Sequence, residues 1–349
     1  MRRLAGVSLC ALMVTVCAVS GSVSDRTRLR AAPAAEHDDG CGPDSAARGA
    51  RPEGARPEGA RPHDHADLGR DQVVAMLDDL RRTLLDRYGT SDERRLDSTL
   101  RRTRGIVVPV RFHVVHSGSR GRLSAKDVGR QMAALNAAYG GRKGGVDTGV
   151  RFRLAGHYRI NSPAWFHQPR RYEAAMKKRL RKGGPGTLNI YTAAVGTDVL
   201  GFSTFPQWYR KRPYMDGVVI DYRSIPGGSL RHFDRGYTAV HETGHWLGLF
   251  HTFENGCVSP GDGVADTPYE ARPAAACPHG RDTCPQRGRD PVHNFMDYAY
   301  DTCMREFTAG QGRRIRAAWA AYRSRRSSAR HVGLGTGPAT GARSVAAHR

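Results

Sequence analysis

The sequence predicts a mixed α/β domain that is followed by an irregular, cross-linked segment. Between residues 106 and 221, β-branched and aromatic runs alternate with stretches of helical spacing, and a further helix begins near residue 238. From residue 254 to residue 303 the chain is rich in Gly, Pro, Asp and Cys, which indicates turns and cross-links in place of regular structure. We therefore expect an upper subdomain, in which a mixed sheet lies above the helix near 238, and a lower subdomain that is held together by disulfides.

The elements of the upper subdomain follow from composition and period. Strands are predicted at residues 107–115, 150–154, 187–192, 200–205 and 217–221, and helices at residues 127–139 and 173–181. A closing helix is expected at 313–322, because Ile315, Ala318, Trp319 and Tyr322 fall on one of its faces.

The segments around this domain have other compositions. Residues 1–24 combine a short positive start with an uncharged apolar run, which is typical of a secretory signal peptide. Residues 25–104 are predicted to be a propeptide, with a flexible Arg-Pro-Glu-Gly-Ala repeat at 51–62 and an amphipathic helix at 71–88. Its basic stretch at 94–104 is either a solvated linker or the place where the propeptide is cut. The folded domain then covers 105–325, and residues 326–349 form a disordered basic tail.

The strongest chemical pattern is the run His241-Glu-Thr-Gly-His-Trp-Leu-Gly-Leu-Phe-His251. His241 and His245 are one helical turn apart, so both imidazoles project from one face and reach a single zinc ion. On a straight helix His251 would lie about 9 Å further along the axis, too far to share that ion. We expect Gly248 to adopt the left-handed conformation and turn the chain back. Glu242 then lies beside a metal-bound water, as a general base would.

A second pattern lies downstream, in Asn294-Phe-Met-Asp-Tyr298. This run resembles the methionine-containing turn of metzincins, which implies that Met296 forms a floor under the zinc. The phenol of Tyr298, two residues on, is expected to reach the metal site and to help stabilise the oxyanion of the reaction.

Together these runs resemble the pappalysin family of metzincins, which are secreted zinc endopeptidases. The resemblance rests on 241–253, 261–268 and 294–298, with Cys303-Met304 and Phe307-Thr308 behind them, and it extends over about residues 105–320. It implies a metzincin-type zincin fold in which residues 201–205 form an antiparallel edge strand. An extended substrate peptide would pair with that edge by strand addition.

The predicted function is therefore that of a secreted zinc endopeptidase, made as a zymogen, that cleaves extracellular proteins or peptides. Two alternatives are a secreted zinc-containing binding module without turnover and an extracellular hydrolase that acts on another bond. The intact Glu242 argues against the binding module, because such a module has no need of a general base.

Five cysteines remain once the signal peptide is removed, an odd number in an oxidising compartment. The four in the lower subdomain allow three pairings, or a second zinc site, although they contain no Cys-x-x-Cys pair. The family resemblance implies the crossed pairing Cys257–Cys284 and Cys277–Cys303. The leftover Cys41, flanked by glycines, is predicted to bind the zinc as a thiolate and silence the zymogen, as in some relatives. The alternative is an exposed cysteine without a role.

Asp262 and Thr267 lie in a Gly-rich turn just after the zinc run. The resemblance implies that they bind a structural calcium ion, and the alternative is that they only stabilise turns. Asp301 stands close to the position where family members that cut before basic residues carry an acid. We predict a mild preference for Arg or Lys after the cut, and hence self-cleavage within 94–104.

The formal net charge is +22 and comes largely from arginine. The arginines are spread over every segment, and no nucleic-acid-binding fold is recognised, so no nucleic-acid partner is expected. No apolar run of about 18 residues follows the signal peptide, so no membrane span is expected. The natural substrate and the oligomeric state do not follow from the sequence.

Overall fold

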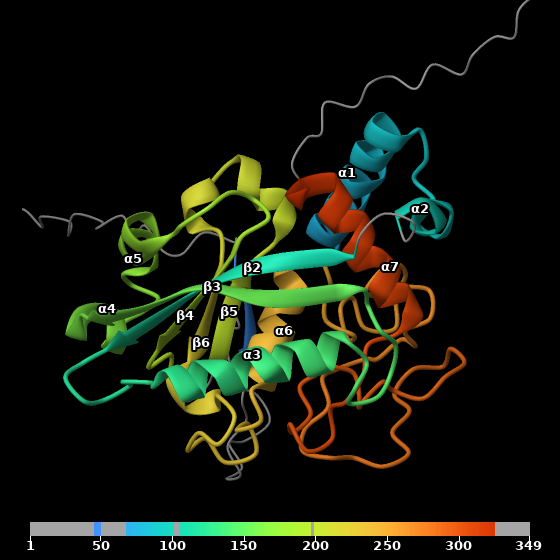
Figure 1. Cartoon of the computed structure of the whole chain (residues 1–349). Coiled ribbons are helices and arrows are strands. Elements are labelled where there is room, and N and C mark those ends of the chain that lie inside the picture. Colours follow the sequence, from blue (N-terminus) through green and yellow to red (C-terminus); the bar gives the residue numbers. More distant parts are fainter. Residues whose placement is uncertain (1–44, 50–67, 101–104, 197–198, 325–349) are drawn as a thin grey trace, which may run out of the picture. The chain divides into compact units, whose positions relative to one another are not determined.

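Six strands form one mixed sheet in the part of the chain that is described, in the order β1-β5-β6-β4-β2-β3 (Figure 1). This computed structural model describes residues 45–49, 68–100, 105–196 and 199–324. Neighbouring strands among β2, β3, β4 and β6 are parallel, whereas β5 is antiparallel to both β6 and β1. The strands are β1 (Ser45–Gly49), β2 (Ile106–His116), β3 (Val150–Asn161), β4 (Leu188–Ala193), β5 (Val199–Thr204) and β6 (Val218–Asp221).

The predicted mixed sheet is confirmed, with two differences. β3 continues to Asn161, because it pairs with β2 along its whole length. β1 lies in the predicted propeptide, where no strand was expected, and it becomes a strand by pairing with the free edge of β5. The predicted signal peptide, the repeat at 51–62, Cys41 and the tail at 326–349 lie outside the described residues.

Helices cover both faces of the sheet. α3 (Ala125–Tyr139) packs against β3, and α6 (Tyr237–Trp246) packs against β5 and β6. Alternation along β2 sends Phe112 and Val114 into the core with α3 and α6, while Val115 joins a second core with α4 (Pro163–His167) and α5 (Glu173–Leu180). None of the helices in the described ranges is long and apolar enough to cross a membrane.

Short helical turns and a C-terminal helix complete the upper subdomain. η1 (Pro206–Arg210) and η2 (Pro213–Met215) connect β5 to β6, and η3 (Tyr222–Ser224) follows β6. α7 (Ala309–Ala318) continues into the π-helical turn η4 (Trp319–Arg323). α7 begins earlier than the predicted residue 313, because the Thr308 side chain accepts the Gln311 amide and caps its first turn.

Two N-terminal helices, α1 (Arg70–Tyr88) and α2 (Glu93–Leu100), lie beside α7 in Figure 1. α1 matches the predicted amphipathic helix and ends at Gly89 in the left-handed conformation, φ 67°. α2 was missed, since its arginines resemble a solvated basic linker. It forms because Leu96 and Asp97 are buried on one side, while Arg94 and Arg95 remain exposed.

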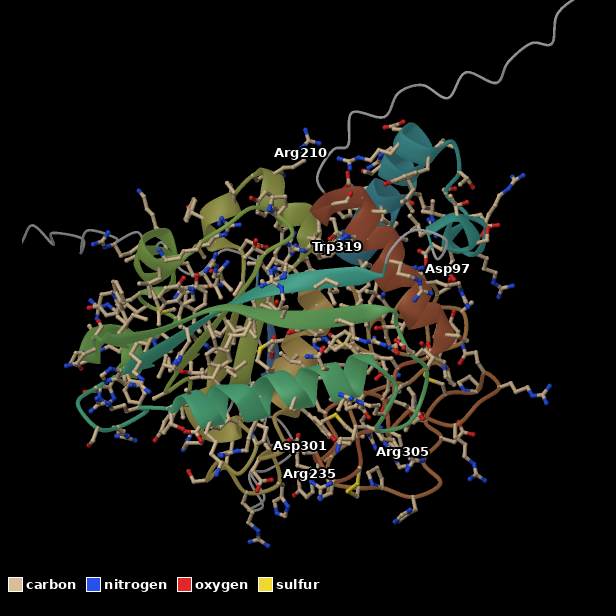
Figure 2. The ribbon with its side chains drawn as sticks, viewed as in Figure 1. Asp97, Arg210, Arg235, Asp301, Arg305 and Trp319 are labelled. Atoms are coloured by element: carbon tan, nitrogen blue, oxygen red, sulfur yellow. A yellow bond between two sulfur atoms is a disulfide. The ribbon has the colours of Figure 1, made fainter. Side chains whose placement is uncertain are left out.

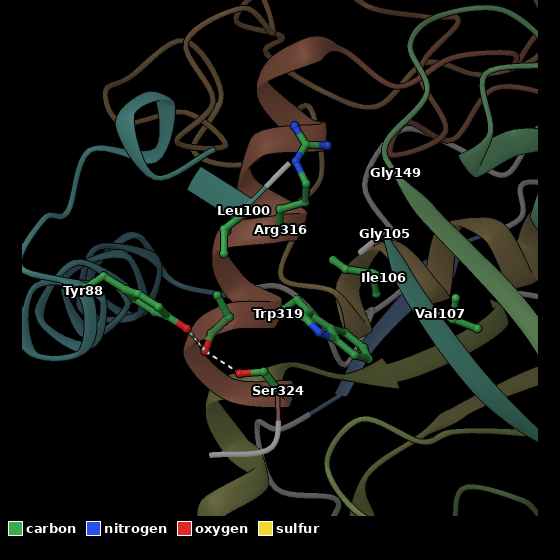
Figure 3. Close-up of a pocket in the computed structure, with 10 residues that line it drawn as sticks. Tyr88, Leu100, Gly105, Ile106, Val107, Gly149, Arg316, Trp319 and Ser324 are labelled. Carbon is green, nitrogen blue, oxygen red and sulfur yellow. Dashed lines mark hydrogen bonds between the residues drawn. The ribbon is translucent and has the colours of Figure 1, made fainter. Parts of the chain in front are cut away.

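Both helices share buried surface with the folded domain that begins at β2. Val73, Met76 and Leu77 of α1 belong to the same core as Phe205 and Phe250. A further cluster joins the two helices to α7 and η4; it contains Leu80, Leu84, Leu96, Ala317, Ala318 and Ala321. Behind it, a cavity of about 360 Å³ lies between the ends of α1 and α2, the start of β2 and η4 (Figure 3). Tyr88 closes one side of this cavity, where its hydroxyl donates to the Ala320 carbonyl at 3.3 Å.

Residues 254–303, all of which the structure describes, contain no helix or strand. Disulfides and ion pairs give this lower subdomain its order. Cys257 is bonded to Cys284 and Cys277 to Cys303, which is the pairing that the resemblance implies.

Candidate active site

Three histidines bring their Nε2 atoms to one point beneath the sheet. His245 Nε2 lies 3.1 Å from the Nε2 atoms of both His241 and His251. In the described chain this is the one group of three His, Cys, Asp or Glu side chains whose ligand atoms all lie within 4.8 Å of one another. All three side chains are buried. The sequence prediction placed these residues together, and the structure does so.

The opposite ring nitrogens hold the imidazoles in place. His241 Nδ1 lies 2.7 Å from the Phe295 carbonyl, and His245 Nδ1 lies 2.8 Å from the Leu249 carbonyl. A carbonyl only accepts, so each Nδ1 carries the proton and each Nε2 presents its lone pair to the centre. Burial, together with the nearby His251 imidazole, holds the pKa of His245 well below its usual value. The ring is therefore neutral, as a metal ligand must be.

Gly248 turns the chain as predicted. α6 ends at Trp246, and Gly248 has φ 95°, a left-handed conformation that favours glycine. The Leu249 amide then bonds back to the Gly244 carbonyl at 2.9 Å. This tight reversal brings His251 opposite His245, and a methyl group added at Gly248 would lie 2.8 Å from the Ala318 side chain.

Glu242 is fully buried on α6, against β5, the strand that was expected to be the edge of the sheet. A methyl group added at Gly201 of β5 would lie 2.9 Å from Glu242 Cγ and 3.0 Å from its Oε1. Gly201 therefore leaves room for the carboxylate. Sequence reasoning placed Gly201 on the edge strand but missed this contact, because it joins residues that are far apart in the chain.

Met296 lies under α6. A methyl group added at Gly244 would lie 2.3 Å from Met296 Sδ, so the glycine of the zinc helix makes space for the methionine. The turn that carries Met296 is fixed by Asn294, whose Oδ1 accepts the Met296 amide at 3.0 Å and whose side chain pairs with Gln311 of α7. The hydroxyl of Tyr298 lies 3.1 Å from His251 Nε2, so it reaches the site.

A buried ion pair holds the C-terminal end of α6. Arg323 of η4 donates from Nε to the Trp246 carbonyl at 2.8 Å and pairs with Asp216 at 3.0 Å. Its guanidinium also lies 3.6 Å from the centre of the Trp246 ring, and Trp246 Nε1 donates to Asp216. This arrangement was not predicted, because arginine at 323 is one of many in the chain.

The remaining predicted residues are buried. Asp262 and Thr267 are buried in the turn that follows Cys257. Asp301 is also buried, and its Oδ2 accepts the Arg235 amide at 2.9 Å, just before α6 begins. Figure 2 shows Arg235 and Asp301 next to each other in this region.

The chain is similar in sequence to known metalloproteases. Residues 230–320 match a family model described as Pregnancy-associated plasma protein-A. Extracellular metalloproteases of Arthroderma benhamiae and Sordaria macrospora are 38% and 44% identical to the chain over 229 and 230 residues, which is 64% of this chain and 75% and 78% of those proteins.

Two solved structures from Tannerella forsythia are also similar. Mature mirolysin in complex with a cleaved peptide has a TM-score of 0.55 at 29% identity, and the match covers 61% of this chain and 91% of that one. A promirolysin mutant has a TM-score of 0.56 at 26% identity, covering 69% of this chain and 92% of that one.

Proposed function

Since this chain belongs to the pappalysin family of metalloproteases, we propose that it is a secreted zinc endopeptidase made as an inactive precursor. The observation that carries the proposal is the arrangement of three buried imidazoles whose Nε2 atoms face one point. Three neutral nitrogen donors that leave a fourth position open are the donor set of a catalytic zinc site. The substrates of such an enzyme are proteins or peptides.

His241, His245 and His251 would hold the zinc ion, which when bound lowers the pKa of a water molecule and polarises the scissile carbonyl. Glu242, buried on the same helix, would accept the proton of the attacking water and pass it to the leaving amine. Tyr298 would donate a hydrogen bond from its hydroxyl to the developing oxyanion. Its position 3.1 Å from His251 Nε2 supports this role.

The direct test is to incubate the purified, processed protein with casein or gelatin and to measure its zinc content. We expect cleavage by the wild type and a loss of about 10²–10⁴-fold in the Glu242→Ala variant, which is the usual contribution of a general base. A wild type that binds one zinc per chain yet cleaves neither substrate would show that the proposal is wrong and favour a binding module.

The position of β1 supports the precursor. Ser45 pairs opposite Thr204 and Arg48 opposite Gly201, so β1 lies along the edge of β5 to which a substrate would add. β1 also lies beside α6. We infer that β1 blocks the substrate edge in the precursor and must leave before an extended peptide can bind.

Cys41 precedes β1 by four residues and lies outside the described residues, so its role as a thiolate latch stays a prediction. We expect the Cys41→Ser full-length protein to cleave peptides before any propeptide is removed. A variant that is as inactive as the wild-type precursor would contradict the latch.

We propose that α1 and α2 remain bound to the catalytic domain after maturation. The predicted cut within 94–104 stays a prediction, and residues 101–104 lie outside the described ranges. Loss of both helices would uncover the apolar surface of α7 and would leave the buried Arg316 without Asp97, its ion-pair partner. Uncompensated buried charge is strongly destabilising.

Gel filtration of the matured protein followed by intact mass measurement tests this proposal. We expect residues 70–100 to elute with the catalytic domain, either continuous with it or as a bound fragment. A folded, active enzyme that begins after residue 104 and carries no such fragment would contradict it.

Calcium binding at Asp262 and Thr267 is a further proposal. Asp262 and Thr267 are buried, with the Thr267 side chain next to the Asp262 carboxylate, and oxygen atoms of this kind suit Ca²⁺. Burial raises the pKa of Asp262 to about 7. We expect calcium to raise the melting temperature of chelator-treated protein, and an unchanged melting temperature would favour the alternative of simple turn stabilisation.

Two finer predictions remain to be tested. The Asp301 carboxylate accepts a hydrogen bond from the Arg235 amide, just before α6. Sequencing of cleaved peptides will show whether Arg or Lys is preferred after the cut. Secretion is supported by the relatives named as extracellular. The N-terminal sequence of the exported protein will show whether residues 1–24 are removed.

A further inference from the structure

We propose that Glu254 is a positioning residue that sets the strength of the third zinc ligand through a hydrogen bond from a charged group. The proposal rests on the zinc endopeptidase function above. Glu254 Oε2 lies 3.3 Å from His251 Nδ1. The other two ligands, His241 and His245, bond to main-chain carbonyls instead. His251 is therefore the imidazole whose second nitrogen faces a carboxylate of a described residue.

The residues that follow His251 in the chain hold its imidazole in place. The Glu254 amide donates to the His251 carbonyl at 3.1 Å, which closes a turn and returns the Glu254 side chain to the imidazole. The Phe253 ring stacks on the His251 ring, with centroids 4.7 Å apart and planes at 10°. His251 follows the end of α6 and has no helix to orient it, so the run His-Thr-Phe-Glu supplies that orientation locally.

Charge makes the Glu254 contact different from a carbonyl contact. Three neutral imidazoles leave the double charge of a zinc ion uncompensated, and a carboxylate on Nδ1–H raises the electron density that Nε2 offers to the metal. Glu254 is only 7% exposed, so water screens this interaction weakly. The same bond fixes the tautomer with the proton on Nδ1.

Two variants separate the charge of Glu254 from its shape. Glu254→Gln keeps an oxygen acceptor of the same size without the charge, and Glu254→Ala removes both. Zinc affinity is measured on metal-free protein by competition with a chromophoric chelator, and the visible spectrum of the Co²⁺-loaded protein reports the ligand field. We expect a 10–100-fold loss of zinc affinity in Glu254→Ala, a smaller loss in Glu254→Gln, and a shifted Co²⁺ spectrum in both.

Asp282→Asn is the matched control, because it removes one exposed negative charge from the same subdomain. Its zinc affinity should equal that of the wild type. Zinc affinities within twofold of the wild type in both Glu254 variants would overturn the proposal. If Glu254→Ala does not fold, Glu254→Gln decides alone. Since affinity is measured without substrate, a protein with no peptidase activity but with this order of affinities would disprove the proposed function and leave the role of Glu254 intact.

Discussion

The first two zinc ligands and the third are held by two very different parts of the molecule. His241 and His245 stand on α6, a helix whose ten residues are all buried beneath the sheet. His251 lies just before residues 254–303, a segment that contains no helix or strand. A helix fixes the spacing of two ligands by its backbone alone. The third ligand depends on side chains and cross-links, so the two regions should respond differently to mutation.

Ion pairs support His251 from below. Thr252 Oγ1 donates to Glu270 Oε2 at 2.8 Å, and Arg281 pairs with both Glu270 and Asp290. The Thr252 amide also donates to the Met296 carbonyl at 3.2 Å. The loop that carries the third ligand is therefore tied to the turn beneath the zinc site and to the loops that the disulfides close.

The largest effect is expected in the upper region, from Arg323→Met. It leaves the buried Asp216 with only the more distant Arg181, at 3.9 Å, as a counter-charge and releases the Trp246 carbonyl at the end of α6. Breaking one side of a buried ion pair costs about 3–5 kcal/mol, to be measured by urea unfolding. Arg210→Met on the exposed surface of η1 is the control, expected to change stability by less than about 0.5 kcal/mol. Equal stabilities would show that the ion pair does not secure the helix.

In the lower region, we expect the double variant Cys257→Ser/Cys284→Ser to lose about 3 kcal/mol, because the bond closes a loop with a sequence separation of 27. The loss should come with weaker zinc binding, since His251 depends on this subdomain. Differential scanning calorimetry with and without zinc measures both. A variant that keeps full zinc affinity would show that the lower subdomain places His251 without this cross-link.

Two glycines in helices provide a sharper comparison. Gly244→Ala on α6 would press a methyl group against Met296 and should cost about 1–3 kcal/mol. Gly129→Ala on α3 meets nothing within 4 Å and should stabilise the protein by about 0.5–1 kcal/mol. Thermal unfolding of both variants measures the difference. If Gly244 is needed to leave space for Met296 and not for helix flexibility, the two variants must change the stability in opposite directions.

The smallest effect concerns pH. Burial and the nearby Asp297 raise the pKa of Glu270 to about 8, from an ordinary value of 4.5. The folded state then holds a proton that the unfolded state loses. This contribution to stability is complete below pH 4.5 and disappears as the pH rises towards 8. Glu270→Gln should flatten the decline in stability between pH 5 and pH 8. Parallel stability curves for wild type and variant would contradict this.

The strands β2, β4, β5 and β6 and the helices α3 and α5 could be predicted because each has its own period and composition, whereas α4 and the last residues of β3 were missed. The failures have physical reasons. α2 forms through Leu96 and Asp97, which contact α7, so its helical state depends on a partner more than 200 residues away. β1 has no apolar period and becomes a strand because β5 offers an unpaired edge.

The sequence by itself determined the metal chemistry. His241, Glu242, His245, Gly248 and His251 lie within one short run, so helix geometry and one left-handed glycine are enough to bring the donors together. The crossed disulfides followed from the family resemblance and not from the spacing of the cysteines.

Only the tertiary structure decided what holds that run in place. It revealed the space that Gly201 leaves for Glu242, the Asp216–Arg323 pair at the end of α6, and the burial of α1 against the catalytic core. Each of these contacts joins residues that are distant in the chain. Their chemistry is ordinary in isolation, and it acquires a role only when packing removes water around these side chains.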